Sequence, residues 1–297
     1  MPFRALLVYP PASEKESGQA SPSVHDPDRL FVPYGMLTIA AELRARGFQA
    51  DVVNLSTLAW PQAVEAIRAR PAELFGLSSY TFNRHATAAL GAEIKRLFPE
   101  SHLTVGGPHV SALPLEWLNH YTAFDTVVIG EGEATAVELA QRLHDGASAL
   151  DLPGTAYRDG EAAVLAPPRD LIGELDAVAG PWRHFDYGFL ITSRGCPGRC
   201  TFCCSPKLWG RKVRFRSPEN VLAEIEQLVG LGVRAIHMYA DLFTLNRDHV
   251  MGICREILAR ELKVRWTCNS RVDFVDEEML QAMAGAGCWM ISWGIES

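Results

Sequence analysis

Three cysteines in the second half of the chain have the spacing of metal ligands. Cys196, Cys200 and Cys203 form a C-x3-C-x2-C pattern within SRGCPGRCTFCCSP, residues 193–206. A short loop with three thiolates can wrap one face of an iron–sulfur cluster, because cluster irons bind cysteines at close sequence spacing. Three ligands for a four-iron cluster leave one iron open, and an open metal position is typical of a site that binds a substrate. The pattern predicts a [4Fe-4S] cluster.

The remaining four of the seven cysteines are weaker metal candidates. Cys204 directly follows Cys203, so its side chain is expected to point away from the cluster. A structural zinc knuckle using both residues is the alternative, but it requires a fourth ligand and usually a second paired motif. The other three lie in apolar helix or strand patterns and are expected in the core, namely Cys254, Cys268 and Cys288.

Composition favours an ordinary globular protein of two domains. The chain has 297 residues, 48% of them hydrophobic and 21% charged. A net charge of -7 argues against broad attraction to phosphate backbones, so no nucleic-acid partner is expected. No apolar run approaches the ~18 to 20 residues needed to span a bilayer, and no secretory segment is visible. A cytoplasmic protein without a membrane span is therefore expected.

Residues 1–145 alternate between short apolar runs and helix-like patterns. The expected strands are residues 3–9, 49–55, 74–79, 102–107 and 125–133. The expected helices are residues 36–47, 61–70, 87–98, 111–120 and 135–146. This order predicts a doubly wound, Rossmann-like α/β domain with five parallel strands.

The ends of these strands are rich in small residues. They read YPP at 9–11, SSY at 78–80, GGPH at 106–109 and GEGE at 130–133. Ligands of doubly wound sheets bind outside the carboxyl ends of the strands. Glycines at a single strand end often do no more than end the strand, but four such ends together predict close approach to a flat or bulky ligand.

Residues 146–185 are expected to form a small hairpin turning at Arg158–Gly160, followed by a proline-rich linker. A second alternation fills residues 186–297, with four expected strands and three intervening helices. Its period of about 26 residues predicts part of a parallel (β/α) barrel. Because the chain stops on a strand, we expect a barrel truncated at its C-terminal side and poorly stable alone.

These segments resemble one enzyme family. CPGRCTFC, with Phe202 before its last cysteine, resembles the cluster loop of the radical S-adenosylmethionine superfamily. Residues 239–247, 268–280 and 293–297 are similar to strand-end segments of that superfamily's barrel. Residues 9–11, 33–55, 106–109 and 127–139 resemble the cobalamin-binding domain that precedes the barrel in one subgroup.

The resemblance implies three cofactors: a [4Fe-4S] cluster on Cys196, Cys200 and Cys203, S-adenosylmethionine at its open iron, and cobalamin. Four polar residues at barrel strand ends are expected to bind the methionine and ribose portions of S-adenosylmethionine, and the backbone at Phe202 is expected to face the adenine. These four are Asp241, Asn269, Arg271 and Glu296. Arg271 and Asp273 can instead form a structural salt bridge.

The residues expected against cobalamin stand at the strand ends of the first domain and in the segment PYG. They are Pro10, Pro11, Tyr34, Gly35, Ser78, Ser79, Tyr80, Gly106, Gly107, His109, Gly130, Glu131 and Gly132.

One departure from many cobalamin domains is visible. An Asp-x-His-x-x-Gly motif, whose histidine ligates cobalt, does not occur, because His25, His85 and His109 lack the flanking residues. The cobalt is therefore expected to lack a lower histidine ligand. His109 can still touch the corrin or be an ordinary loop histidine.

The family resemblance implies a cobalamin-dependent radical methyltransferase that acts on an unactivated carbon of a small molecule or natural product. An oxidative cyclase or rearrangement enzyme of a tetrapyrrole or natural-product pathway is the alternative, and a metal-stapled binding module is the non-enzymatic one. An external electron donor such as flavodoxin or ferredoxin is the implied partner. No catalytic side chain and no particular substrate follow from the sequence.

Overall fold

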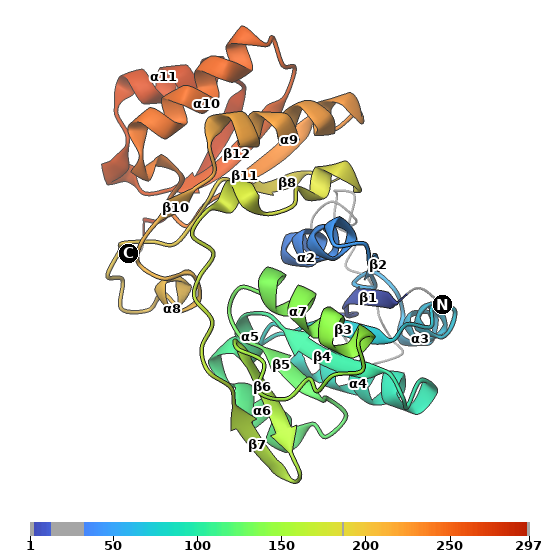
Figure 1. Ribbon diagram of the computed structural model, residues 1–297. Helices are drawn as coiled ribbons and strands as arrows, with labels where there is room; N and C mark the ends of the chain where they lie inside the picture. The colour runs from blue at the N-terminus through green and yellow to red at the C-terminus, as the bar shows by residue number, and fades with distance from the viewer. Residues whose placement is uncertain (1–2, 13–32, 186, 296–297) are drawn as a thin grey trace. The chain divides into compact units, whose positions relative to one another are not determined.

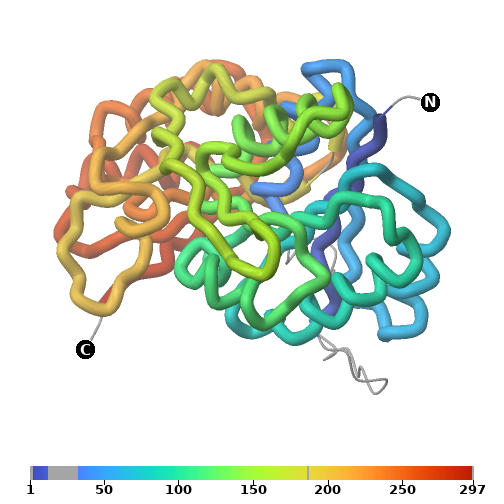
Figure 2. Tube along the Cα trace, turned by 60° about the horizontal axis from the view of Figure 1, so that its bottom comes forward, coloured from blue at the N-terminus to red at the C-terminus, as the bar shows by residue number. Residues whose placement is uncertain are grey.

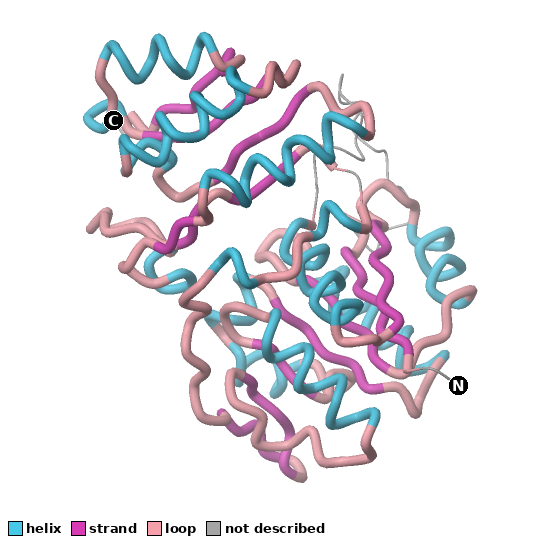
Figure 3. The backbone as a smooth tube through the Cα atoms, turned by 45° about the horizontal axis from the view of Figure 1, so that its top comes forward, coloured by secondary structure: helices cyan, strands magenta, loops and turns pink. Residues whose placement is uncertain are grey.

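The computed structural model describes residues 3–12, 33–185 and 187–295. The chain divides into two compact units, Met1–Leu171 and Ile172–Ser297, which we call unit 1 and unit 2. Each unit has a parallel sheet of its own with helices packed against it (Figures 1 and 3). None of the helices within the described ranges is both long enough and apolar enough to cross a bilayer.

Unit 1 is built on a seven-stranded sheet in the order β2-β1-β3-β4-β5-β6-β7. Its strands are β1 (Arg4–Tyr9), β2 (Gln49–Asn54), β3 (Leu74–Ser78), β4 (His102–Gly106), β5 (Thr126–Val128), β6 (Thr155–Asp159) and β7 (Ala162–Leu165). The first five are parallel, which confirms the predicted doubly wound α/β fold. The hairpin β6–β7, yellow-green in Figure 2, adds two antiparallel strands that the five-stranded prediction does not include.

The helices of unit 1 cover both faces of this sheet. They are α2 (Tyr34–Ala45), α3 (Trp60–Arg68), α4 (Arg84–Leu97), α5 (Pro108–Ala112), α6 (Pro114–His120) and α7 (Glu133–His144). The chain leaves β1 toward β2 on one side and passes from β3 toward β4 on the other. Because such crossovers are right-handed, α2 and α4 lie on opposite faces. Helix α7 packs on α2, and α3 packs on α4 (Figure 1).

Apolar strands that are buried on both faces form the core of unit 1. Phe75 and Leu77 of β3, Leu103 and Val105 of β4, and the nearby Phe124 are almost completely shielded from solvent. The strand order reverses between β1 and β3, so the carboxyl ends of these two strands mark the position where doubly wound sheets bind ligands.

Unit 2 contains a four-stranded parallel sheet in the order β13-β12-β11-β8, and a short antiparallel pair, β9 with β10. Its strands are β8 (Phe189–Ile191), β9 (Ser193–Arg194), β10 (Arg214–Phe215), β11 (Ala235–Tyr239), β12 (Arg265–Ser270) and β13 (Cys288–Trp293). Its helices are α8 (Ser205–Trp209), α9 (Pro218–Gly230), α10 (Arg247–Ala259) and α11 (Glu277–Gly285). The four parallel strands and the three long helices between them match the predicted partial barrel.

Polar side chains start the three long helices of unit 2. Ser217 accepts a hydrogen bond from the amide of Asn220, Asn246 from that of His249, and Asp276 from that of Met279. Each bond satisfies one of the amides that a helix leaves open at its N-terminus. These caps fix the residue at which each strand-end loop becomes a helix.

A buried ion pair between Arg216, just after β10, and Glu224 of α9 contacts strand β8. Arg216 and Glu224 are 7% and 0% exposed, and the guanidinium donates to the carboxylate. Arg216 also donates to the carbonyl oxygen of Ile191 at 2.9 Å, and the hydroxyl of Tyr187 donates to Glu224 at 2.6 Å. The guanidinium lies 5.2 Å from the ring centroid of Trp182. Strand β8, helix α9 and the segment before β8 thus share one polar network.

Replacing Glu224 with alanine removes the buried carboxylate that accepts from the Arg216 guanidinium and the Tyr187 hydroxyl. We expect the free energy of unfolding of unit 2 to fall by about 3–5 kcal/mol, measured by urea unfolding followed by circular dichroism. Glu224→Gln keeps an acceptor and is expected to cost less. Glu256→Ala, which breaks a pair with Arg260 that is about one third exposed, is the matched control and is expected to cost under about 1 kcal/mol. Equal losses in Glu224→Ala and Glu256→Ala contradict the prediction.

Candidate functional site

The predicted cluster cysteines lie on the loop between β9 and α8 in unit 2. Cys196 is half-buried, Cys200 and Cys203 are exposed, and all three are free thiols. The amide of Gly198 donates to the sulfur of Cys196 at 3.4 Å. A Cβ placed on Gly198 would lie 3.2 Å from the Cys196 sulfur and 3.9 Å from the Cys200 sulfur. These two thiols therefore both lie next to Gly198, which has no side chain.

The third cysteine follows by a tight turn, in which the amide of Cys203 donates to the carbonyl oxygen of Cys200 at 3.2 Å. Among the residues described, no three His, Cys, Asp or Glu side chains gather as closely as a single metal ion requires. A cluster differs from a single ion because each thiolate binds a different iron. Accessible thiols on a loop with an N–H···S hydrogen bond fit that donor set.

The backbone of residues 210–212, just after α8, holds the start of the cysteine loop. Gly195 has a φ of +100°, and a Cβ there would lie 2.6 Å from the carbonyl oxygen of Lys212. The amide of Cys196 donates to the carbonyl oxygen of Gly210 at 3.2 Å. Arg211 donates to the carbonyl oxygen of Gly198 at 2.5 Å. Only glycine fits at position 195, since both the conformation and the space exclude a side chain.

Among the polar residues predicted at the barrel strand ends, Asp241 contacts this loop directly. Asp241 follows β11, and its Oδ2 accepts from the amide of Gly195 at 3.1 Å. Asn269, in β12, donates through Nδ2 to the carbonyl oxygen of Ala240. Its Oδ1 is buried and has no hydrogen-bond partner in the part of the chain that the structure describes. An orphaned buried acceptor suits a ligand that donates to it, because leaving it unpaired is costly.

Arg271 lies just past β12 and forms the salt bridge with Asp273, with Nη2 and Oδ2 at 2.7 Å. The hydrogen bond to this carboxylate raises the pKa of Arg271 above its ordinary value, and the nearby Cys200 and Cys196 add to the shift. The Arg271 guanidinium thus interacts electrostatically with two of the predicted cluster cysteines. Phe202 is 69% exposed, and Glu296 lies outside the described residues.

The glycine-rich strand ends of unit 1 meet at one edge of its sheet. The amide of Ser79 donates to the carbonyl oxygen of Gly106 at 2.8 Å, and the amide of His109 donates to that of Ser79 at 3.2 Å. Gly107 has a φ of +104°, and a Cβ there would lie 2.8 Å from the Ser79 oxygen. The amide of Gly130 donates to the hydroxyl oxygen of Ser111 at 3.0 Å. Backbone groups therefore make the closest contacts between the ends of β3 and β4.

The remaining predicted cobalamin residues surround the same strand ends. Pro10 and Pro11 follow β1 and are buried, and Tyr34 and Gly35 form the first turn of α2. Glu131 and Gly132 lead into α7, and a Cβ on Gly132 would lie 2.8 Å from the Cδ1 atom of Ile39. The start of α7 is therefore packed directly against α2.

Exposed aromatic rings stand at this edge. Tyr80 and Phe82 are 39% and 64% exposed and stack with their centroids 5.6 Å apart. The ring centroid of Tyr9 lies 6.3 Å from that of Tyr80, and burial together with Tyr80 raises the pKa of Tyr9 to about 12. His109 contacts the Thr81 hydroxyl at 3.2 Å through Nδ1, and burial lowers its pKa. Neutral rings and bare backbone fit a flat, largely apolar ligand such as a corrin.

Two buried polar atoms at the same edge have no hydrogen-bond partner among the described residues, the Ser79 hydroxyl and Nδ2 of Asn83. Asn83 is 1% exposed, and its Oδ1 accepts from the amide of Tyr80 at 2.8 Å. Neither Asn83 nor Phe82 is among the sequence predictions. The available signal is their place just after the strand end, with Asn83 directly before α4. An amide N–H and a hydroxyl suit the amide groups that fringe a corrin.

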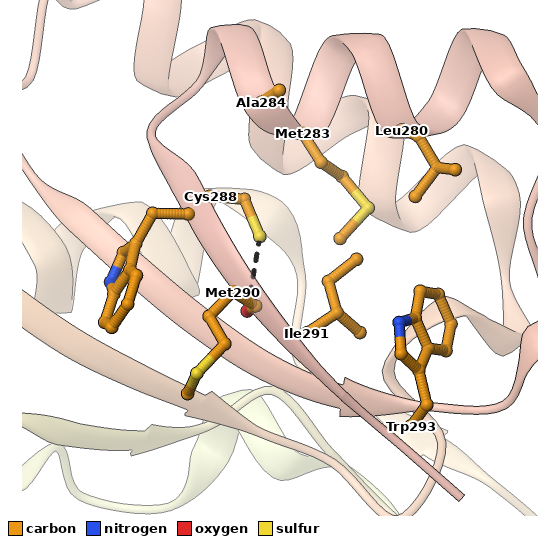
Figure 4. A pocket seen from close by; sticks show the side chains of 8 residues that line it. Leu280, Met283, Ala284, Cys288, Met290, Ile291 and Trp293 are labelled. Carbon is orange, nitrogen blue, oxygen red and sulfur yellow. Dashed lines mark hydrogen bonds between the residues drawn. The ribbon is translucent and has the colours of Figure 1, made fainter. Parts of the chain in front are cut away.

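Cys204 directly follows Cys203 and is exposed, whereas the other three cysteines lie outside the cysteine loop. Cys254 and Cys268 are buried, as predicted, and burial raises the pKa of Cys254 to about 12. Cys288 is half-buried and lines an apolar groove of 290 Å³ between α11 and β13 (Figure 4). The groove is lined by Leu280, Met283, Ala284, Cys288, Trp289, Met290, Ile291 and Trp293, none of them a predicted cofactor residue.

Two family models match the chain. A B12 binding domain matches residues 27–140, and the radical SAM superfamily matches residues 190–297. Cobalamin, a [4Fe-4S] cluster and S-adenosylmethionine, the three predicted cofactors, are the cofactors of these two domains.

Two relatives align with nearly the whole chain. The uncharacterized methyltransferase PH0819 of Pyrococcus horikoshii is 28% identical and aligns with 99% of this chain and 66% of its own length. The anaerobic magnesium-protoporphyrin IX monomethyl ester cyclase of Rubrivivax gelatinosus is 28% identical over 99% of this chain and 56% of its own length. The chain thus spans less than two thirds of either relative.

A solved structure has the same fold. The radical S-adenosylmethionine methyltransferase TsrM of Kitasatospora setae, determined with cobalamin and a [4Fe-4S] cluster bound, is 22% identical. Its TM-score is 0.80, over 99% of this chain and 59% of that one. With a B12 binding domain that covers most of unit 1 and a radical SAM domain in unit 2, the chain belongs to the cobalamin-binding radical S-adenosylmethionine enzymes.

Proposed function

We propose that this radical SAM enzyme is a cobalamin-dependent methyltransferase acting on an unactivated carbon of a small molecule or natural product. The observation that carries the proposal is the position of the Cys196 and Cys200 thiols on either side of Gly198, within 3.2 and 3.9 Å of where its Cβ would lie. The chain also carries a cobalamin-binding domain. The similarity to PH0819 and TsrM, both described as methyltransferases, favours methyl transfer.

Roles follow from where each side chain lies. Cys196, Cys200 and Cys203 would hold the cluster, and the strand-end residues of unit 1 would hold cobalamin. Asn269 would accept a hydrogen bond from S-adenosylmethionine at its orphaned Oδ1. The Arg271 guanidinium, paired with Asp273, would face the carboxylate of the same cofactor. When bound, the cluster supplies the electron that cleaves S-adenosylmethionine, and cobalamin supplies the methyl group. Phe202 and Glu296 remain predicted contacts of the same cofactor.

Two partners belong to this proposal. The substrate would be a small molecule, and an external flavodoxin or ferredoxin would deliver the electron. No side chain is assigned to proton transfer at the substrate.

Replacing the loop cysteines one at a time tests the cluster ligands. After anaerobic reconstitution with iron and sulfide, Cys196→Ala, Cys200→Ala and Cys203→Ala are each expected to lose most of the visible absorbance of the cluster, since each removes one thiolate. Cys204→Ala is the matched control and is expected to keep it. A protein that loses its cluster with Cys204→Ala but retains it with Cys203→Ala has a different ligand set.

Asn83→Asp tests the cobalamin edge. Aspartate keeps the oxygen that accepts from the Tyr80 amide but replaces the orphaned Nδ2 donor with an acceptor. We expect the Kd for cobalamin, measured by absorbance titration, to rise about tenfold, as the loss of one buried hydrogen bond predicts. Glu93→Gln, at the ion pair between Glu93 and Arg96 on α4, is the control and is expected to leave the Kd unchanged. An unchanged Kd in Asn83→Asp rules out this contact.

Labelled S-adenosylmethionine separates methyl transfer from cyclisation, the reaction named for the Rubrivivax relative. The reconstituted protein is incubated with a reductant, cobalamin, a small-molecule extract of its source cells and methyl-labelled S-adenosylmethionine. We expect label in an extracted product only when cobalamin is present, read by mass spectrometry. Cleavage of S-adenosylmethionine together with an unlabelled, modified product supports the cyclase instead. Absence of both cluster absorbance and cleavage supports a binding module.

A further inference from the structure

Asp241 lies at the carboxyl end of β11, where the sequence predicts a ligand of S-adenosylmethionine. We propose instead that Asp241 is a positioning residue that fixes the start of the cysteine loop. Its Oδ2 accepts from the amide of Gly195 at 3.1 Å, across a separation of 46 residues. This inference rests on the proposed function only in requiring that the loop bind a cluster.

Gly195 is the residue at which such a contact has most effect on Cys196. On one side, the carbonyl oxygen of Lys212 lies 2.6 Å from where a Cβ would be. One residue later, the amide of Cys196 donates to Gly210 at 3.2 Å. The Asp241 carboxylate holds the Gly195 amide beside these two contacts. The first cluster cysteine is therefore attached to a strand end of the sheet, and not only to its own loop.

The second carboxylate oxygen also has a partner within unit 2. The hydroxyl of Tyr239, on β11, lies 3.5 Å from Oδ1 of Asp241. Asn269 on the adjacent strand differs, because its Oδ1 is buried and accepts no hydrogen bond from any residue within 3–12, 33–185 and 187–295. The acceptor left open for a cofactor at this edge is therefore on Asn269, whereas both oxygens of Asp241 already contact the protein.

The rest of the loop depends on a different contact. Arg211 donates to the carbonyl oxygen of Gly198, between Cys196 and Cys200, and its side chain extends from the exposed segment after α8. Loss of Asp241 would release Gly195 while leaving this contact in place. We therefore expect a cluster that assembles poorly rather than an unfolded unit.

Two substitutions distinguish positioning from cofactor binding. Asp241→Asn keeps an oxygen that can accept from Gly195 and removes the charge, whereas Asp241→Ala removes both. After anaerobic reconstitution, iron and sulfide content, the electron paramagnetic resonance spectrum of the reduced cluster and the Kd for S-adenosylmethionine are measured. Asp248→Ala, at a carboxylate in the first turn of α10, is the control and is expected to behave as the unsubstituted protein.

We expect Asp241→Asn to retain the cluster and to bind S-adenosylmethionine within about twofold of the unsubstituted protein, because the hydrogen bond to Gly195 is rescued. Its cluster is expected to have a more positive midpoint potential, since a nearby negative charge disfavours reduction. Asp241→Ala is expected to lose about half or more of its iron and to alter the spectrum.

Either of two results overturns the inference. A full cluster with an unaltered spectrum in Asp241→Ala shows that the loop does not need this contact. A full cluster in Asp241→Asn, combined with a Kd for S-adenosylmethionine raised about tenfold or more, makes Asp241 a ligand of that cofactor. Failure of the unsubstituted protein to assemble any cluster contradicts the proposed function, which keeps the two tests separate.

Discussion

Parallel pairing constrains both units in the same way, because every parallel strand ends at the same edge of its sheet. In unit 2 this brings the segments that follow β8, β11 and β12 to one edge, where the Gly195 amide donates to Asp241. In unit 1 the same rule places the ends of β3 and β4 side by side, joined by hydrogen bonds between Ser79 and its neighbours across the sheet. Groups far apart in sequence are gathered without any long loop.

At both of these edges the backbone segments lie so close together that a side chain would not fit between them. Gly195 and Gly107 both have positive φ angles, and in both a Cβ would collide with a carbonyl oxygen. Each glycine lets two backbone segments approach closely, and the free N–H and C=O groups of one segment bond to the other. A larger residue at either position would push apart the backbone segments that carry the predicted cofactor residues.

Local spacing leads to the prediction of the three cysteines as cluster ligands, because the ligands of a loop site lie in nearly consecutive residues, and their role stays a prediction. Alternating apolar runs are sufficient to predict the parallel strands of both units, whose buried faces require them. The hairpin β6–β7 is visible in the sequence as a turn, but its pairing with β5 is not, since the partner of an edge strand depends on long-range contacts. Asn83 and the partner of Asp241 also lie beyond sequence reasoning, because burial and hydrogen bonding arise only when separate segments pack.

The orphaned polar atoms also link cofactor binding to the folding stability of the protein. Ser79 Oγ, Asn83 Nδ2 and Asn269 Oδ1 have given up contact with water without gaining a partner in the described structure. Each such atom costs about 1–3 kcal/mol until it is satisfied. A cofactor that bonds to them binds the native state and not the unfolded chain, so cofactor uptake and folding stability are linked. The loaded protein should therefore melt at a higher temperature than the same chain without its cofactors.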